Sequence, residues 1–151
     1  MARPASAPTL MPTAVLARAW SVQIGLLLLA ALTAAQLVAT LEVDGRSMEP
    51  QLQPGDRVLV DLWTYTQRAP RPNEVVWIAG TAPLEAGLIK RAASAPTGRT
   101  PVPAAGPSVW VLGDNPAESL DSRAFGAVPL TRVRGRVVLR YWPPSRSGWI
   151  R

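Results

Sequence analysis

Two residues of the chain, Ser47 and Lys90, are of types that could carry out chemistry together. The 151-residue sequence has no histidine and no cysteine, which excludes Ser-His-Asp and Cys-His catalysis and every His- or Cys-ligated metal site. A serine hydroxyl is a weak nucleophile until a neighbouring base removes its proton, so the base must be a carboxylate or an amine. The basic residues are 15 arginines and one lysine, and arginine does not deprotonate in proteins. We therefore hypothesise that neutral Lys90 activates Ser47.

The run 88–93 is apolar enough to predict a strand that carries Lys90. Side chains alternate along a strand, so Lys90 shares a face with Leu88 and Ala92. Burial on that face would lower the lysine pKa from about 10.4 and favour the neutral amine. An ordinary exposed strand lysine and a turn or capping serine are the alternatives for Lys90 and Ser47.

The polar segment 113–126 follows a predicted strand at 109–112. It contains Asp121 and Arg123, which could form an ion pair, and the hydroxyls of Ser119 and Ser122, which could orient an amine. A solvated loop and a calcium loop are the alternatives, but the acidic residues miss the EF-hand spacing. We expect no metal and no cofactor.

Further strands are predicted at 58–60, 73–78 and 136–141, and residues 94–108 predict a loop. Several short strands separated by turns, without a soluble helix, predict an all-β domain that is compact and folded or closed on itself. The formal charge is +6, but the dense arginines at 132, 134, 136 and 140 alternate as on one exposed strand face. We therefore expect no binding to nucleic acid.

The amino-terminal part predicts a membrane anchor. Residues 1–18 are rich in proline and predict a disordered tail, and residues 19–41 carry no charge. Such a run is long enough to cross a bilayer as one transmembrane helix. A buried core helix and a cleavable secretory signal are the alternatives. The arginines flanking the run favour a cytoplasmic tail and place the β domain, residues 42–151, on the extracytoplasmic side.

Four segments of the sequence resemble bacterial type I signal peptidases, the membrane-bound Ser/Lys proteases that remove leader peptides from exported proteins. The matching segments are residues 45–52 with Gly55-Asp56, 88–91, 113–119, and 121–123 with Gly126. The resemblance covers most of residues 43–142, and the matches within 113–126 are highly specific.

The resemblance implies that Ser47 is the nucleophile, that its backbone amide donates to the oxyanion, and that Lys90 is the general base. It also implies supporting roles. The supporting residues are Ser119, which would orient the lysine, Asp121 and Arg123, which would pair, Met48, which would line the substrate cleft, and Asp114 and Asn115.

Three departures from the family pattern stand out. Gly45 replaces a serine that donates a second oxyanion bond in some members, and Pro116 stands where arginine is common. Only 22 residues separate Lys90 from Gly113, too few for the large accessory β-domain of some members.

The resemblance implies a serine endopeptidase of the plasma (inner) membrane that cuts after Ala-X-Ala. Its expected partners are signal peptides of exported preproteins and membrane lipid, and we expect a monomer. The alternatives are a self-cleaving repressor-type Ser/Lys protease and a catalytically silent, membrane-anchored β module that only binds partners.

Overall fold

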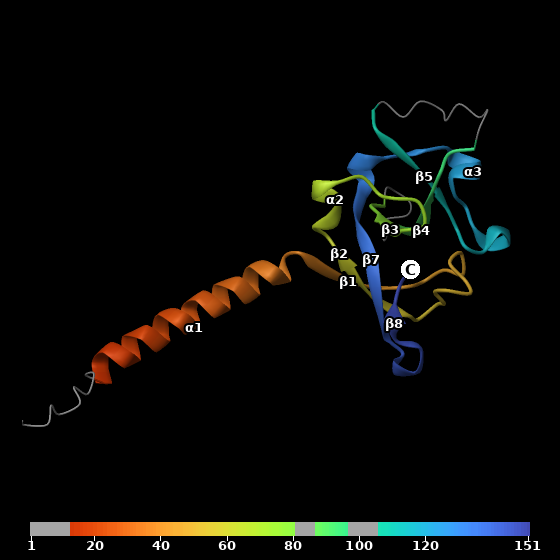
Figure 1. Cartoon of the computed structure of the whole chain (residues 1–151). Helices are drawn as coiled ribbons and strands as arrows, with labels where there is room; N and C mark the ends of the chain where they lie inside the picture. The colour runs from red at the N-terminus through yellow and green to blue at the C-terminus, as the bar shows by residue number, and fades with distance from the viewer. Residues whose placement is uncertain (1–12, 81–86, 97–105) are drawn as a thin grey trace, which may run out of the picture. The chain divides into compact units, whose positions relative to one another are not determined.

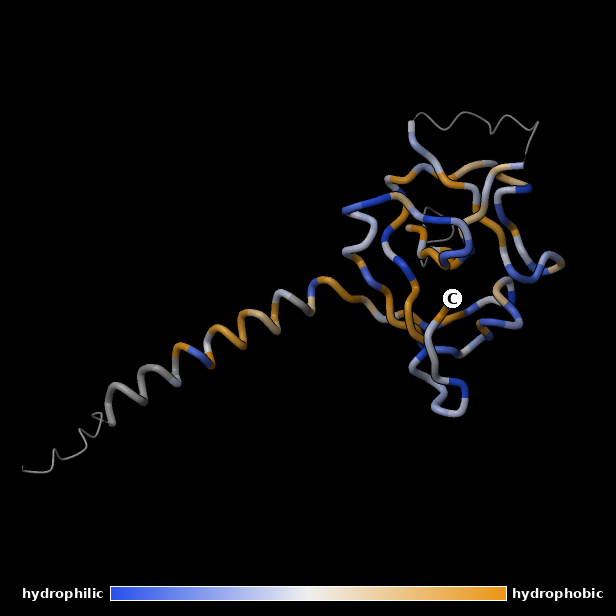
Figure 2. Tube along the Cα trace, viewed as in Figure 1, coloured by the Kyte–Doolittle hydropathy of each residue, from blue (hydrophilic) through white to orange (hydrophobic). Residues whose placement is uncertain are grey.

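The computed structural model describes residues 13–80, 87–96 and 106–151. Helix α1, Thr13–Ala35, belongs to one compact unit, and residues 36–151 form a second. Figure 2 shows the hydrophobic stretch along α1, where large apolar side chains such as Leu27 and Leu28 are exposed. Among the residues described, no helix combines the length and the apolar character needed to span a membrane.

The helix and the predicted span have different bounds. Helix α1 already begins at Thr13, within the expected tail, and residues 1–12 lie outside the described part. At the other end the prediction is wrong, because residues 38–41 belong to strand β1, Val38–Glu42. These residues alternate between the core and solvent, as the side chains of a strand do. Ala39 and Leu41 pack against the core, while Thr40 and Glu42 are exposed.

The second unit is a curled antiparallel sheet, which confirms the all-β class (Figure 1). Its remaining strands are β2 Arg57–Asp61, β3 Val75–Ile78, β4 Leu88–Ala93, β5 Ser108–Leu112, β6 Val128–Pro129, β7 Val133–Trp142 and β8 Gly148–Trp149. In the described ranges the order is β1-β2-β7-β3-β4-β5-β6, with β8 on β7. The order has two ends, so the sheet is curled rather than closed. The five strands predicted in this unit correspond to β2, β3, β4, β5 and β7.

Short helical turns connect the strands. They are the α-helices α2 Thr64–Gln67 and α3 Ser122–Phe125 and the 3-10 turns η1 Pro116–Glu118, η2 Leu130–Arg132 and η3 Pro144–Arg146. Helix α3 begins where the Asp121 side chain accepts a hydrogen bond from the Arg123 amide. Three of these turns, η1, α3 and η2, therefore lie between β5 and β7.

Apolar side chains form two clusters, one on each side of the sheet. Successive side chains of β3 point to opposite sides of the sheet, so Val75 belongs to one cluster and Val76 to the other. The first comprises Val43, Met48, Leu52, Val58, Val60, Val75, Val137 and Ile150. The second comprises Val76, Ile78, Ala92, Val109, Val111 and Val128. The strand that carries Lys90, β4, therefore lies between two packed layers.

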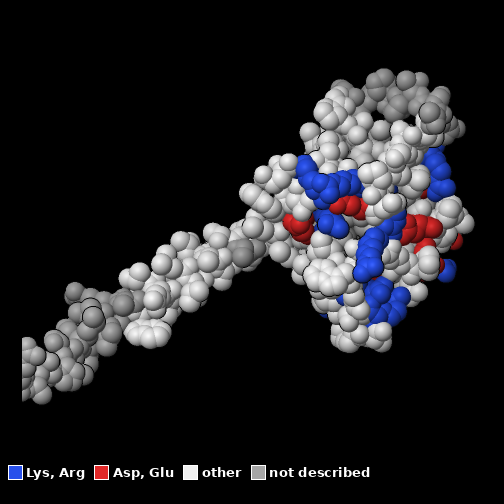
Figure 3. Space-filling view, in the orientation of Figure 1, with Lys and Arg blue, Asp and Glu red and all other residues white. Residues whose placement is uncertain are grey.

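The arginines at the carboxyl-terminal strand do not form one exposed face. Arg140 lies 3.5 Å from the buried carboxylate of Asp56, and Arg136 lies 3.6 Å from Glu74. Figure 3 shows basic and acidic side chains next to each other on this side of the molecule. The expectation of a single exposed basic face is wrong, because two carboxylates with little solvent contact draw these guanidinium groups inward.

Candidate active site

Ser47 lies in a tight turn between β1 and β2. The Leu52 amide donates to the Met48 carbonyl at 2.8 Å, and the side chains of both residues are buried in the first apolar cluster. Ser47 itself is only half-buried. The apolar anchors therefore fix the turn and leave the Ser47 hydroxyl at the surface of the core.

Lys90 lies in the middle of β4 with its side chain on the buried face. It is 3% exposed, it stands opposite Val76 of β3, and its Nζ forms a 2.6 Å hydrogen bond with Ser47 Oγ. Burial lowers the pKa of the Lys90 amine below its ordinary value, and the negative charge of Asp121 opposes this shift only in part. The site thus combines a hydroxyl with an amine that sheds its proton more readily than a solvated lysine.

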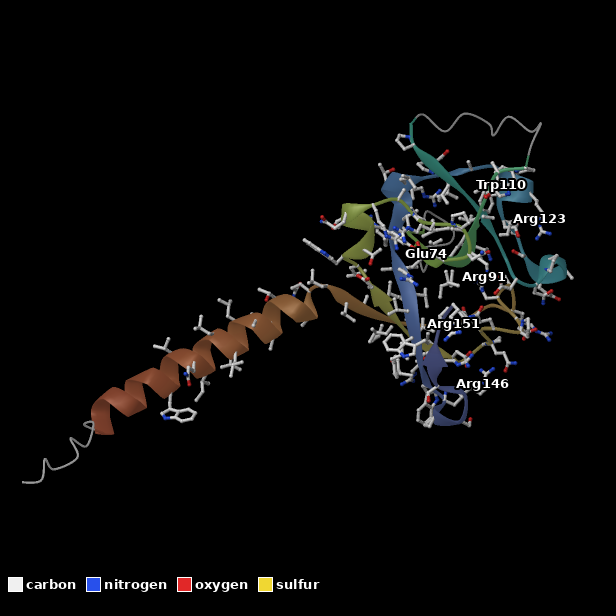
Figure 4. The ribbon with its side chains drawn as sticks, in the orientation of Figure 1. Glu74, Arg91, Trp110, Arg123, Arg146 and Arg151 are labelled. Atoms are coloured by element: carbon white, nitrogen blue, oxygen red, sulfur yellow. The ribbon has the colours of Figure 1, made fainter. Side chains whose placement is uncertain are left out.

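The segment 113–115, directly after β5, connects the serine turn to β4. The Asn115 amide donates to the Ser47 carbonyl at 3.0 Å. Asp114 accepts two hydrogen bonds from the guanidinium of Arg91, at 2.6 and 2.7 Å, and Arg91 directly follows Lys90. Figure 4 shows the Arg91 side chain beside Arg151, whose carbonyl accepts a further bond at 2.9 Å. Segment 113–115 therefore fixes the positions of the Ser47 turn and of the strand that carries Lys90.

Asp121 organises the other side of this segment. Its fully buried carboxylate accepts hydrogen bonds from Arg123 at 2.6 and 2.8 Å, from the Gly113 amide at 2.9 Å and from the Ser119 hydroxyl at 2.8 Å. Burial alone would raise the Asp121 pKa, but these donors outweigh it and hold the pKa well below its usual range. Asp121 is therefore an anion around which the loop is built.

Ser119 differs from the role that the resemblance implies. Its hydroxyl donates to Asp121, and the hydrogen bond that Lys90 makes within the described chain is to Ser47. Ser122, the other candidate hydroxyl, accepts from the Val111 amide at 2.9 Å and is buried. The hydrogen bonds of both serines in this structure thus stabilise the loop after β5.

Comparison with known proteins identifies the family of this chain. The sequence model of a family described as "Signal peptidase, peptidase S26" matches residues 16–100 and 97–142. The chain belongs to this family. The S26 assignment makes it a serine peptidase, and it confirms the resemblance stated for the four sequence segments.

Relatives of this signal peptidase family member come from organelles and from cyanobacteria. The chain is 31% identical over 129 residues to the "Mitochondrial ATP-independent inner membrane protease subunit 1a" of Arabidopsis thaliana, covering 76% of this chain and 77% of the relative. It is 34% identical over 124 residues to the "Mitochondrial inner membrane protease subunit 2" of Saccharomyces cerevisiae, covering 71% and 70%. It is 29% identical over 139 residues to the "Probable signal peptidase I-2" of Synechocystis, covering 70% and 64%.

A small cavity of about 130 Å³ opens beside the serine and lysine of this S26 peptidase. Its described lining residues are Leu41, Glu42, Val43, Asp44, Gly45, Ser47, Met48, Trp77, Gly87, Leu88, Ile89 and Lys90. The lining comes from two segments, 41–48 and 87–90, with one residue from β3. Met48, which the resemblance implies at the substrate cleft, is in this wall. Within the described ranges, no three acidic side chains lie close enough to hold a metal ion.

Sequence reasoning missed several residues of the site. Gln51 accepts a hydrogen bond from Arg91 and donates another to the Arg151 carbonyl, and Trp77 and Gly87 line the cavity. Trp77 lies in the strand predicted at 73–78 and stands opposite Ile89, the residue before Lys90, but the period of a single strand does not predict that pairing. No signal in the sequence alone connects Gln51 with Arg91, which lie 40 positions apart.

Proposed function

We propose that this chain is a membrane-anchored serine endopeptidase that removes amino-terminal leader peptides from exported proteins, with Ser47 as nucleophile and Lys90 as general base. The observation that carries the proposal is the 2.6 Å hydrogen bond between Lys90 Nζ and Ser47 Oγ, made by the one lysine of the chain. Membership of the signal peptidase family and the relatives named as signal peptidases support the substrate class.

The reaction proceeds through a covalent intermediate. The neutral Lys90 amine removes the Ser47 proton as Oγ attacks the carbonyl carbon of the last leader residue, and the carbonyl electron pair moves to its oxygen. Collapse of this tetrahedral species breaks the carbon–nitrogen bond, and the Lys90 ammonium gives its proton to the leaving amine. Lys90 then takes a proton from a water molecule as its oxygen attacks the ester carbon. The bond between this carbon and Ser47 Oγ breaks, the Lys90 ammonium returns the proton to Oγ, and the leader leaves with a free carboxylate.

The remaining residues position these two groups. The Ser47 backbone amide donates to the developing oxyanion, and with glycine at position 45 a second side-chain donor is missing there. Asp121 stays ionised and accepts hydrogen bonds from Arg123 and Ser119. Its negative charge acts on the Lys90 amine. Asp114 and Asn115 fix the distance between the serine turn and β4.

The cavity supports a preference for small residues. A volume of about 130 Å³ lies far below the roughly 300 to 1,000 Å³ typical of pockets that hold drug-sized ligands. An extended leader end lying between segments 41–48 and 87–90 would place alternate side chains in this space. Leaders of the form Ala-X-Ala, with small first and third residues before the cut, therefore fit the site.

Purified full-length protein in detergent tests the proposal against synthetic Ala-X-Ala leader peptides. We expect cleavage after the last alanine, measured by mass spectrometry, and its complete loss in Ser47→Ala and Lys90→Ala. Lys90→Arg should also be inactive, because it keeps the charge and cannot supply a neutral amine. Exposed Ser145 offers the matched control, since Ser145→Ala makes the same change away from the cavity.

Circular dichroism and thermal unfolding must show that each inactive variant keeps the native fold. Cleavage retained by Lys90→Ala would eliminate the proposed base, because the chain has no second lysine. A folded wild-type protein that cuts no leader peptide at all would instead favour a silent, membrane-anchored binding module.

The membrane anchor belongs to the same proposal, as a single span formed by the uncharged amino-terminal run, with the β domain as an extracytoplasmic monomer. The exposed apolar side chains of α1 support it. Leu27→Arg with Leu28→Arg would place two charges mid-helix, each costing about 2.5 to 3.5 kcal/mol in a bilayer. Alkaline extraction should release this variant and leave the wild type and a Leu27→Ala, Leu28→Ala control in the membrane pellet. Release of the wild type would refute the anchor.

A further inference from the structure

Asp56 is a buried carboxylate that takes no part in the proposed chemistry. It is fully buried, as Asp121 is, and it directly precedes β2 at the end of the loop that carries Ser47. We call this loop, residues 43–56, the serine loop. Burying a carboxylate is costly unless cations and hydrogen-bond donors replace the lost water. The groups that compensate Asp56 therefore indicate what this side chain holds in place.

Two guanidinium groups from the carboxyl-terminal part of the chain compensate Asp56. Arg146, in η3, donates a hydrogen bond to one carboxylate oxygen, and Arg140, in β7, lies 3.5 Å from the other. The Arg140 guanidinium also donates to the Arg146 carbonyl. These contacts join residues 84 and 90 positions apart, so they attach the end of the serine loop to the end of β7.

The same group of residues holds both limbs of the serine loop. On the amino-terminal limb, the Val43 amide donates to the Asp56 carbonyl at 2.8 Å. On the carboxyl-terminal limb, the Gln53 amide donates to the Asp56 carboxylate at 2.9 Å. The Gln51 carbonyl accepts a hydrogen bond from Arg140 at 2.5 Å. Both limbs are thus fixed at one buried point, the base of the loop.

This attachment is separate from the one that segment 113–115 provides. The Asn115 amide reaches the loop at the Ser47 carbonyl, whereas Asp56 holds the base of the loop. A loop fixed at one point alone could rotate about that contact and move Ser47 Oγ relative to Lys90 Nζ, which lies 2.6 Å away. A displacement of about 1 Å is enough to slow catalysis about 100-fold.

We infer that Asp56 is a positioning residue of this peptidase. Held by Arg140 and Arg146, it fixes the base of the serine loop and thereby keeps the Ser47 hydroxyl in register with the lysine amine. The inference rests on the proposed function and deepens it by adding a second, independent support for the nucleophile. The predicted role is one of geometry, so removing it should slow the reaction without changing the pH at which the amine becomes neutral.

Arg146→Met tests the inference in the purified full-length protein with an Ala-X-Ala leader peptide. The Arg146 side chain is 30% exposed, and methionine keeps an unbranched chain while it removes one of the two cations. At a temperature at which circular dichroism shows the variant to be folded, we expect kcat per folded molecule to fall at least about tenfold. The midpoint of the pH–rate profile should stay at the wild-type value, because burial and the charge of Asp121 shift the Lys90 pKa.

Arg134→Met is the matched control. It makes the same exchange at an exposed residue of β7, so its kcat and its pH–rate midpoint should equal those of the wild type. A folded Arg146→Met variant with the kcat of this control would overturn the inference. So would a variant that is slow because its midpoint has moved, since the arginine would then act on the amine and not on the loop.

Hydrogen exchange in the wild-type protein tests the same inference without any variant. The Val43 and Gln53 amides should exchange as slowly as the paired amides of β2, because both donate to the buried Asp56. Fast exchange at both positions would overturn the inference even if Arg146→Met did not fold. A wild type that cuts no leader peptide would refute the proposed function instead.

Discussion

Gly113 offers a sharp test of how the site is held together. A Cβ built at this position would lie 2.1 Å from Ser119 Oγ and 2.6 Å from the Ser47 carbonyl oxygen. Ordinary contacts begin at about 3.4 Å, so Gly113→Ala requires the backbone of Ser47 or Gly113 to move by roughly 0.8 Å. The Asp121 hydrogen bond to the Gly113 amide restrains that movement.

The expected losses follow from this displacement. Overpacking of this kind costs about 1 to 3 kcal/mol, which lowers the melting temperature by roughly 4 to 12 °C for a unit of this size. A shift of nearly 1 Å between nucleophile and base lowers kcat/KM by about 100-fold. Thermal unfolding and leader-peptide cleavage by the same purified variant measure both quantities.

Gly45→Ala is the matched control for Gly113→Ala. Gly45 also lines the cavity, but a Cβ at this position meets nothing within 4 Å. The melting temperature of the control should therefore lie within about 1 to 2 °C of the wild-type value. Surface substitutions usually change the unfolding free energy by no more than about 0.5 kcal/mol. If Gly113→Ala matches it in both melting temperature and cleavage rate, the proposed clamp between segment 113–115 and Ser47 is wrong.

The pH dependence of stability and of activity gives two further tests. Although burial opposes ionisation, Arg68 and the Arg71 amide lower the pKa of Glu74 from 4.5 to about 2. Glu74→Gln should therefore cost up to about 3 kcal/mol of unfolding free energy at pH 7 in urea titrations. That deficit should shrink as the pH falls from 4.5 towards 2, and a constant deficit would contradict the assignment. The cleavage rate should rise with pH as the Lys90 amine becomes neutral. Because burial lowers its pKa, the rate should level off at a pH below 10.5, the ordinary pKa of lysine. A cleavage rate independent of pH would argue against Lys90 as the base.

The strand pattern predicted the fold well where each strand has its own apolar period. The predicted alternation in 88–93 matches the structure, in which Lys90 and Ala92 are buried. The same reasoning failed at residues 38–41, because the uncharged run 19–41 hides a change of period from helix to strand. Thr40 is the only polar residue among those four, and one hydroxyl is too weak a signal to mark the boundary.

Side-chain partners were harder to predict than positions. The pairing of Asp121 with Arg123 involves neighbours in sequence, and the structure has it at 2.6 Å. The hydroxyl of Ser119 could reach either Asp121 or an amine, and composition alone does not decide which. Contacts such as that between Gln51 and Arg91 depend on how the whole sheet curls, so local sequence patterns do not predict them. The catalytic roles of Ser47 and Lys90 stay predictions until the variants are assayed.

The clamp formed by segment 113–115 has a consequence for the newly made chain. Asn115 holds the Ser47 carbonyl and Asp114 holds the residue after Lys90, so the hydroxyl and the amine are fixed in register only after segment 113–115 has emerged and folded. A nascent chain still attached to the ribosome would carry the parts of a protease without its activity. Late assembly would thereby protect the half-made molecule and its neighbours from premature cutting.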